Sequence, residues 1–169
     1  QFRKINCSKR SKTRRESMNE NFTALEWLDV GNAYGIKGDF DTAIMYFKKA
    51  IEINPKLAEA YYNLGLTYNY KDDLDTAIMY YKKTIELNPE DGHAYNNMGN
   101  AYNNKGDLDA AEICYKKAFE LNPDNAAANG NIGNMYEKKG DLDTAIIYYK
   151  KAIEMNPDNF AAQSNRFVH

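Results

Sequence analysis

The most informative segment of this chain is residues 58–91, which read AEAYYNLGLTYNYKDDLDTAIMYYKKTIELNPED. The next 34 residues, 92–125, repeat the pattern as GHAYNNMGNAYNNKGDLDAAEICYKKAFELNPDN. Proline marks the period, because successive prolines are 34 residues apart, at Pro55, Pro89, Pro123 and Pro157. Self-similarity at a fixed period of about 20–50 residues is typical of repeat architectures. The period predicts four repeats, at residues 24–57, 58–91, 92–125 and 126–159.

Alignment on the prolines brings four further columns into register: a glycine, a tyrosine, an alanine and an aromatic residue. They are Gly31, Gly65, Gly99 and Gly133; Tyr34, Tyr68, Tyr102 and Tyr136; Ala43, Ala77, Ala111 and Ala145; and Phe47, Tyr81, Tyr115 and Tyr149. A glycine inside a helix costs about 1 kcal/mol relative to alanine. Glycine at the same position of all four repeats predicts that the paired helices approach each other closely there. The tyrosine and aromatic columns are expected to fill the space between neighbouring helices.

Each repeat is expected to form two helices. Trp27, Val30, Gly31 and Tyr34 are spaced i, i+3, i+4, i+7, which is the stripe of an amphipathic helix. A glycine, replaced by Asp72 in the second repeat, then breaks the chain, and the next aspartate is suited to cap a second helix. These capping aspartates are Asp39, Asp73, Asp107 and Asp141. The proline ends the second helix, because the residue before a proline disfavours helical geometry. The expected helices cover 24–37, 40–53, 58–71, 74–87, 92–105, 108–121, 126–139 and 142–155.

These columns resemble the tetratricopeptide repeat (TPR) family, whose 34-residue unit carries a large apolar residue, Gly, Tyr, Ala, an aromatic residue, Ala and Pro at these offsets. The resemblance covers all four repeats. The departures are Asn129, in place of an aromatic residue, and Thr84, in place of an alanine. The resemblance implies an all-α fold, a right-handed superhelical solenoid of antiparallel helical hairpins whose first helices line a concave groove. It also implies that the chain binds peptides or proteins.

Charge separates the chain into two parts. Residues 1–23 hold seven Lys and Arg residues against two acids, a net charge of +5, whereas residues 24–159 hold fourteen lysines against twenty-two acids. The basic leader, residues 1–23, is expected to be disordered. An alternative is that residues 1–17 are foreign to the native chain, since Met18 resembles an initiator. The alternatives for its Lys9–Arg15 run are a nuclear address, a nucleic-acid contact or an acidic partner. Residues 160–169 are expected to form a truncated capping helix.

Patterns that would indicate an enzyme are missing from the sequence. It contains no GxGxxG, GxxxxGK[ST] or HExxH motif, and its two histidines are His93 and the final residue, His169. We therefore expect no catalysis, no cofactor, no metal and no small-molecule substrate. The two cysteines, Cys7 and Cys114, favour a reduced cytoplasmic location, and no apolar run approaches the roughly 18 residues of a membrane span. The lysine pairs on the second helices are followed by glutamates, so nucleic acid is not an expected partner of the array.

The predicted groove is rich in amides, which offer both a donor and an acceptor to an extended peptide backbone. Its expected binding residues are Asn32, Asn63, Asn97, Asn100, Asn131, Asn134, Tyr62 and His93. Asparagine ladders in TPR and armadillo superhelices hold peptide main chain, which the resemblance suggests here. The cations of a chaperone carboxylate clamp are missing from these columns. Asparagine is also abundant throughout the chain, so the ladder could be an average family feature. We expect Asn97 and Asn131 to be exposed, so that alanine there would weaken binding with little effect on stability.

Three functions fit these patterns. The leading hypothesis is a non-catalytic protein-interaction scaffold that binds an extended peptide or a partner's helix in the amide-rich groove. The second is a structural array that self-assembles into homo-oligomers through exposed repeat ends. The third is a regulatory or targeting domain of a larger enzyme. The sequence does not identify the partner.

Overall fold

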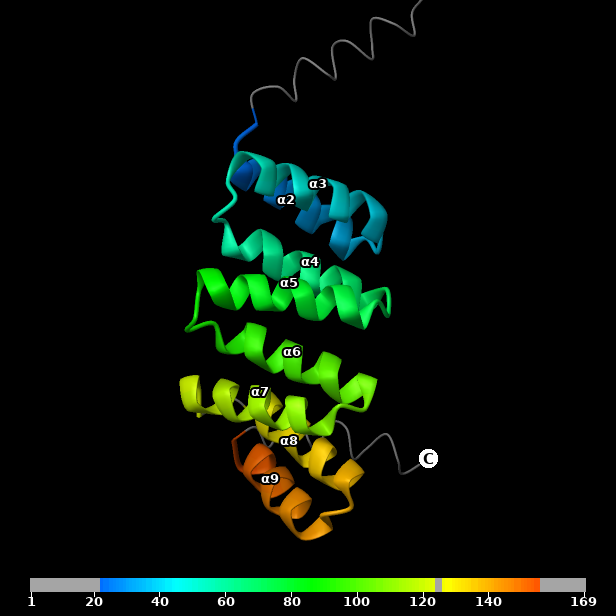
Figure 1. Ribbon diagram of the computed structural model, residues 1–169, viewed down its shortest axis with the longest axis vertical. Helices are drawn as coiled ribbons and strands as arrows, with labels where there is room; N and C mark the ends of the chain where they lie inside the picture. Colours follow the sequence, from blue (N-terminus) through cyan, green and yellow to red (C-terminus); the bar gives the residue numbers. More distant parts are fainter. Residues whose placement is uncertain (1–21, 124–125, 156–169) are drawn as a thin grey trace, which may run out of the picture. The chain divides into compact units, whose positions relative to one another are not determined.

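The computed structural model describes residues 22–123 and 126–155, and the regular secondary structure over these ranges is α-helix alone, joined by short turns. The helices, drawn in Figure 1, are α2 (Ala24–Ile36), α3 (Phe40–Ile53), α4 (Ala58–Tyr70), α5 (Leu74–Leu87), α6 (Gly92–Lys105), α7 (Leu108–Leu121), α8 (Ala126–Lys139) and α9 (Leu142–Met155). Each boundary lies within one residue of its expected position, and the predicted all-α array of helical hairpins is confirmed. The leader up to residue 21 and the expected capping helix at 160–169 lie outside the described residues. The chain divides into two compact units, Gln1–Ala60 and Tyr61–His169, with the boundary inside α4.

The predicted start and stop signals set the helix ends. The Oδ1 atom of Asp39 accepts a hydrogen bond from the backbone N–H of Thr42 at 3.2 Å, and the later capping aspartates do the same at their own helices. The asparagine before each described proline has extended backbone, for example φ −130° and ψ 91° at Asn54, and ends the second helix. Between the helices of three hairpins a glycine adopts positive φ, and Asp72 takes the same conformation in the second repeat, with φ 61°.

The first compact unit is held together by aromatic packing between α2 and α3. Thr23 caps α2, with Glu26 closing a capping box. The Trp27 ring stacks on the Tyr46 ring, with 5.1 Å between centroids, and the Lys49 ammonium lies 4.5 Å from the Trp27 centroid. This arrangement combines the large burial of an aromatic pair with a cation–π contact.

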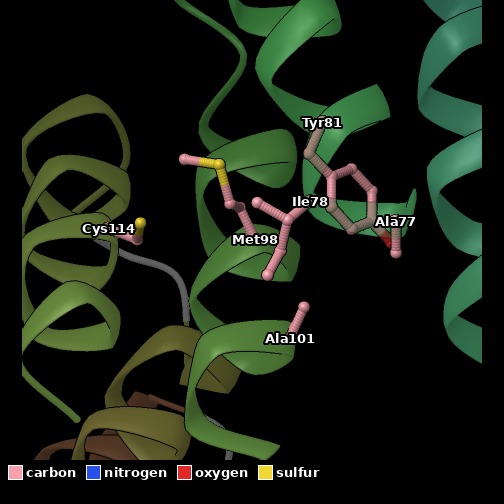
Figure 2. Packing of buried hydrophobic residues seen from close by; sticks show 6 residues of the cluster. All are labelled: Ala77, Ile78, Tyr81, Met98, Ala101 and Cys114. Atoms are coloured by element: carbon pink, nitrogen blue, oxygen red, sulfur yellow. The ribbon is translucent and has the colours of Figure 1, made fainter. Parts of the chain in front are cut away.

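In the second compact unit, α5 packs against α6 and α7 packs against α8. Figure 2 shows the buried cluster formed by Ala77, Ile78, Tyr81, Met98, Ala101 and Cys114, in which Ile78 of α5 lies beside Met98 and Ala101 of α6. Burial raises the pKa of the Cys114 thiol to about 11, so this cysteine packs as a small apolar group and not as a reactive thiolate.

The glycine column has the close contact that the sequence predicts. A Cβ atom added to Gly99 would lie 2.7 Å from Cδ1 and Cε1 of the Tyr115 ring, and the other three glycines meet Phe47, Tyr81 and Tyr149 at 2.5–2.7 Å. Real Cβ contacts essentially never fall below 3.0 Å. Each first helix therefore needs glycine here so that the aromatic ring of the second helix can lie against its backbone.

Candidate functional site

Six asparagines of the second compact unit line one pocket, with a volume of about 610 Å³. They come from the first helices of three successive repeats, which are α4, α6 and α8, and they are joined by Glu137 and Lys138 of α8. The asparagines are Asn69, Asn100, Asn103, Asn104, Asn131 and Asn134. We call this the amide pocket. The predicted amide-rich surface thus forms a hollow over these three helices, although only three of the eight expected residues, Asn100, Asn131 and Asn134, line it.

Two of the pocket asparagines also hold the aromatic column in place. The Tyr115 hydroxyl donates to Oδ1 of Asn100 at 2.7 Å. The Tyr149 hydroxyl lies 2.6 Å from Oδ1 of Asn134 and 2.6 Å from Oε2 of Glu137. The single phenol proton is shared between these two acceptors, of which the Glu137 carboxylate is the stronger. Burial, followed by the bond to Glu137, raises the pKa of Tyr149 to about 12, which keeps the phenol protonated.

Two other asparagines connect neighbouring repeats. Nδ2 of Asn97 donates to the Tyr62 hydroxyl at 2.9 Å, and Nδ2 of Asn131 donates to Oδ1 of Asn96 at 3.2 Å. Both donors are partly buried. The expectation that Asn97 and Asn131 are exposed is therefore wrong, because the first helices approach each other closely enough to bond across the repeat junction. Asn131 still lines the amide pocket, whereas Asn97 does not.

The remaining expected residues lie outside the pocket. Asn63 is partly buried on α4, and its backbone oxygen accepts from the Thr67 hydroxyl at 2.7 Å. His93 is exposed near the start of α6. Tyr62 packs against Tyr81, with 6.1 Å between ring centroids, and burial raises its pKa. Asn32 is partly buried on α2 in the first compact unit.

The sequence analysis missed the far end of the amide pocket. Asn69 and Asn103 lie three residues beyond the last position considered in their helices, and Asn104, Glu137 and Lys138 extend the same end of the pocket. The helical spacing i+3 and i+4 was the signal that could have found them. Nζ of Lys138 donates to Oδ1 of Asn103 at 3.0 Å, whereas Oδ1 of Asn69 is buried without a hydrogen-bond partner in the described structure.

The second repeat departs from this pattern. Leu66 occupies the position at which Asn100 and Asn134 accept a tyrosine hydroxyl. The Tyr81 hydroxyl consequently lies buried with no hydrogen-bond partner among the described residues, and burial raises its pKa strongly. This part of the array presents apolar Leu66 in place of an amide.

Glu112 on α7 is a second feature that the sequence analysis missed. Its Oε1 accepts from the Tyr136 hydroxyl at 2.8 Å and pairs with Lys116 at 2.8 Å, and its Oε2 pairs with Lys139 at 2.6 Å. Hydrogen bonds from Lys116, Lys139 and Tyr136, in that order, lower the pKa of Glu112 to about 2. The signal in the sequence was an acid in a column that holds isoleucine in every other repeat, including Ile78.

Two properties of the described ranges bear on metal binding and on membrane insertion. No group of three or more His, Cys, Asp or Glu side chains there is arranged to hold a metal ion. Among the helices from α2 to α9, none has the length and apolar character needed to cross a membrane.

Comparison with known proteins gives concordant results. Family models described as TPR repeat or tetratricopeptide repeat match residues 31–72, 58–91 and 90–158. The solved structure titled "Crystal structure of MamA" is 31% identical, with a TM-score of 0.77, covering 89% of this chain and 86% of that one. "MamA MSR-1 C2" is 28% identical, with a TM-score of 0.70 and coverages of 83% and 81%. "MamA 41-end from Desulfovibrio magneticus RS-1" is 23% identical, with a TM-score of 0.76 and coverages of 83% and 80%, and shares the fold. Curated protein sequences give no match.

Proposed function

The chain belongs to the tetratricopeptide repeat family, and from this we propose that it is a non-catalytic scaffold whose amide pocket binds an extended segment of a partner protein. The repeats and the matched structures support a protein-interaction scaffold in general terms. The observation that carries the specific proposal is the convergence of six asparagines from three successive first helices on one pocket.

The chemistry of the pocket suits a peptide main chain. An extended backbone presents N–H donors and C=O acceptors in alternation, and amides match both. Asn104 and Asn134 are exposed and line the pocket, so their amides are accessible to a ligand backbone. The internal bonds of Asn100 and Asn131 fix these two side chains before a ligand arrives, which reduces the entropy lost on binding. Glu137 and Lys138 give the pocket one charge of each sign, so the proposed ligand needs no strong net charge.

The test compares two alanine variants after affinity capture and mass spectrometry have identified a ligand. The double variant Asn104→Ala/Asn134→Ala removes two exposed amides from the pocket. Each lost hydrogen bond should cost about 0.5–1.5 kcal/mol, so binding should weaken roughly tenfold to a hundredfold while the melting temperature changes little.

Asn97→Ala is the matched control. It removes an asparagine from the same helix as Asn104, yet Asn97 lies outside the pocket and bonds to Tyr62. Its affinity for the ligand should equal that of the wild type, although its stability should fall by about 1 kcal/mol. Wild-type affinity in Asn104→Ala/Asn134→Ala, measured by isothermal titration, would exclude the amide pocket as the binding site.

A further inference from the structure

A second pocket, with a volume of about 660 Å³, lies over α5 in the second compact unit. One part of its lining is apolar and aromatic, with Tyr61, Met79 and Tyr80. Another part carries the donor groups of Lys82, Tyr102 and Lys105. Two ion-paired acids also line it: Asp75, which pairs with Lys105, and Glu86, which pairs with Lys83. None of these residues belongs to the amide pocket, so the function of this second pocket is a separate question.

The next repeat supplies an internal template for these three donors. Residues 34 positions later are Lys116, Tyr136 and Lys139. There, all three donors converge on one carboxylate, that of Glu112, at 2.6–2.8 Å. A carboxylate bound by two ammonium groups and a phenol is held by charge-assisted hydrogen bonds, which are the strong ones in proteins.

In the second repeat the donors are conserved in position while the acid is missing. Ile78 stands where the template has Glu112, and it is a buried apolar side chain. Lys105 pairs with Asp75 in the same way as Lys139 pairs with Asp109, so the two junctions share this ion pair. Lys82 has no carboxylate partner within the described ranges; its ammonium lies 5.9 Å from the centroid of the Tyr102 ring instead.

We propose that this second pocket is a receptor for an acidic side chain of a partner protein, whose carboxylate binds, beside Ile78, the donor set that Glu112 binds in the next repeat. Lys82, Tyr102 and Lys105 donate to the carboxylate. The apolar part of the pocket receives an aromatic or aliphatic neighbour of that acid. The rings of Tyr61 and Tyr80, whose centroids are 6.4 Å apart, form one side of this part, and the exposed thioether of Met79 forms the other. Methionine is unbranched and polarizable, so it adapts to an incoming apolar group.

The occupant follows from charge complementarity. The lining holds three lysines and two acids, and both acids are already paired, Asp75 with Lys105 and Glu86 with Lys83. Lys82 is thus the cation of the lining with no carboxylate partner among the described residues, and an incoming acid meets the donor set that binds Glu112 one repeat later. The ligand is thus a segment containing Glu or Asp beside an apolar residue. Because Lys82 and Lys105 are exposed, binding of this ligand should weaken with added salt.

The test uses two short probes that differ only in the carboxylate: N-acetyl-Glu-Phe-amide and N-acetyl-Gln-Phe-amide. Each is titrated into the ¹⁵N-labelled full chain and followed by NMR. The Glu probe should shift the amide signals of Lys82, Tyr102 and Lys105, with an affinity at least tenfold higher than that of the Gln probe. Equal affinities for the two probes, or shifts confined to other residues, would overturn the proposal.

Three variants sharpen the test. Lys82→Ala and Tyr102→Phe should each weaken binding of the Glu probe severalfold or more, whereas Lys117→Ala, a surface lysine paired with Glu120, should leave it unchanged. Ile78→Glu places an internal acid among the same donors and should abolish binding. Lys82→Ala and Tyr102→Phe decide the matter if Ile78→Glu fails to fold. Loss of binding in the amide-pocket variant Asn104→Ala/Asn134→Ala, with Lys82→Ala unaffected, would contradict the assignment.

Discussion

Two glycines of α8 provide a direct test of how closely the helices of a hairpin approach. A Cβ atom added to Gly133 would lie 2.7 Å from Cδ1 and Cε1 of Tyr149, whereas one added to Gly130 would have no neighbouring atom within 4 Å. Both residues are in the same helix, three positions apart, and neither has positive φ. Replacing either glycine by alanine therefore makes the same change to the helix backbone, but only Gly133→Ala also brings a Cβ atom against the Tyr149 ring.

The two variants should differ in their free energy of unfolding. Alanine is favoured over glycine in a helix interior by about 1 kcal/mol, so Gly130→Ala should stabilise the protein by about that amount. Gly133→Ala has the same backbone gain, opposed by overpacking against the Tyr149 ring, which typically costs about 1–3 kcal/mol. The backbone contribution cancels in the comparison. The two variants should differ by about 1–3 kcal/mol, with Gly133→Ala the less stable.

Guanidinium unfolding followed by circular dichroism measures this difference. Both substitutions lie in one repeat, so any non-uniform unfolding of the array affects them alike. Adding Tyr149→Val to each glycine variant should remove most of the difference, because the ring is the only predicted source of the clash. If Gly133→Ala proves as stabilising as Gly130→Ala, the close approach of helix and ring is refuted.

Two further predictions concern buried polar groups. Tyr81→Phe removes a buried hydroxyl without a partner and should raise the free energy of unfolding by about 1 kcal/mol, whereas Tyr115→Phe removes a bonded hydroxyl and should lower it by about 1 kcal/mol in the same denaturant titration. Because the pKa of Glu112 falls from 4.5 to about 2 on folding, its stabilisation is present above pH 4.5 and is lost as the pH falls toward 2. Glu112→Gln should therefore cost about 1 kcal/mol at pH 7 and reduce the loss of stability between pH 4.5 and 2, measured by denaturant unfolding at each pH.

The helices and their caps were predictable from the sequence because each depends on residues close together in the chain. The asparagine before each proline, the aspartate at each second helix and the glycine opposite each aromatic ring act within one hairpin. The bonds from Asn97 to Tyr62 and from Asn131 to Asn96 act between hairpins. They depend on how far one repeat turns relative to the next, which a 34-residue period alone does not specify.

Three residues of the predicted groove, Asn100, Asn131 and Asn134, line the amide pocket, because amides recur at fixed positions of the repeat. Their role in ligand binding stays a prediction. Asn69 was not predicted because it lies one helical turn beyond Leu66, the last groove position expected on its helix. Glu112 was missed because in sequence it resembles one more surface acid, and only its three donors in the structure show that it closes a junction.

The column that holds Ile78 and Glu112 has a consequence for protein engineering. Each junction of the second compact unit has the same two lysines and tyrosine, so a single residue determines whether they are occupied from within the chain. An array built by concatenating copies of residues 92–125 would contain glutamate at every internal junction and should be stiff and sensitive to acid. An array built from copies of residues 58–91 would keep isoleucine there, and on the proposal above it would carry one acid-binding pocket at each internal junction. Replacing glutamate by isoleucine at this one position of each repeat would thus change an array with no free sites at its junctions into one that binds several acidic ligands at once.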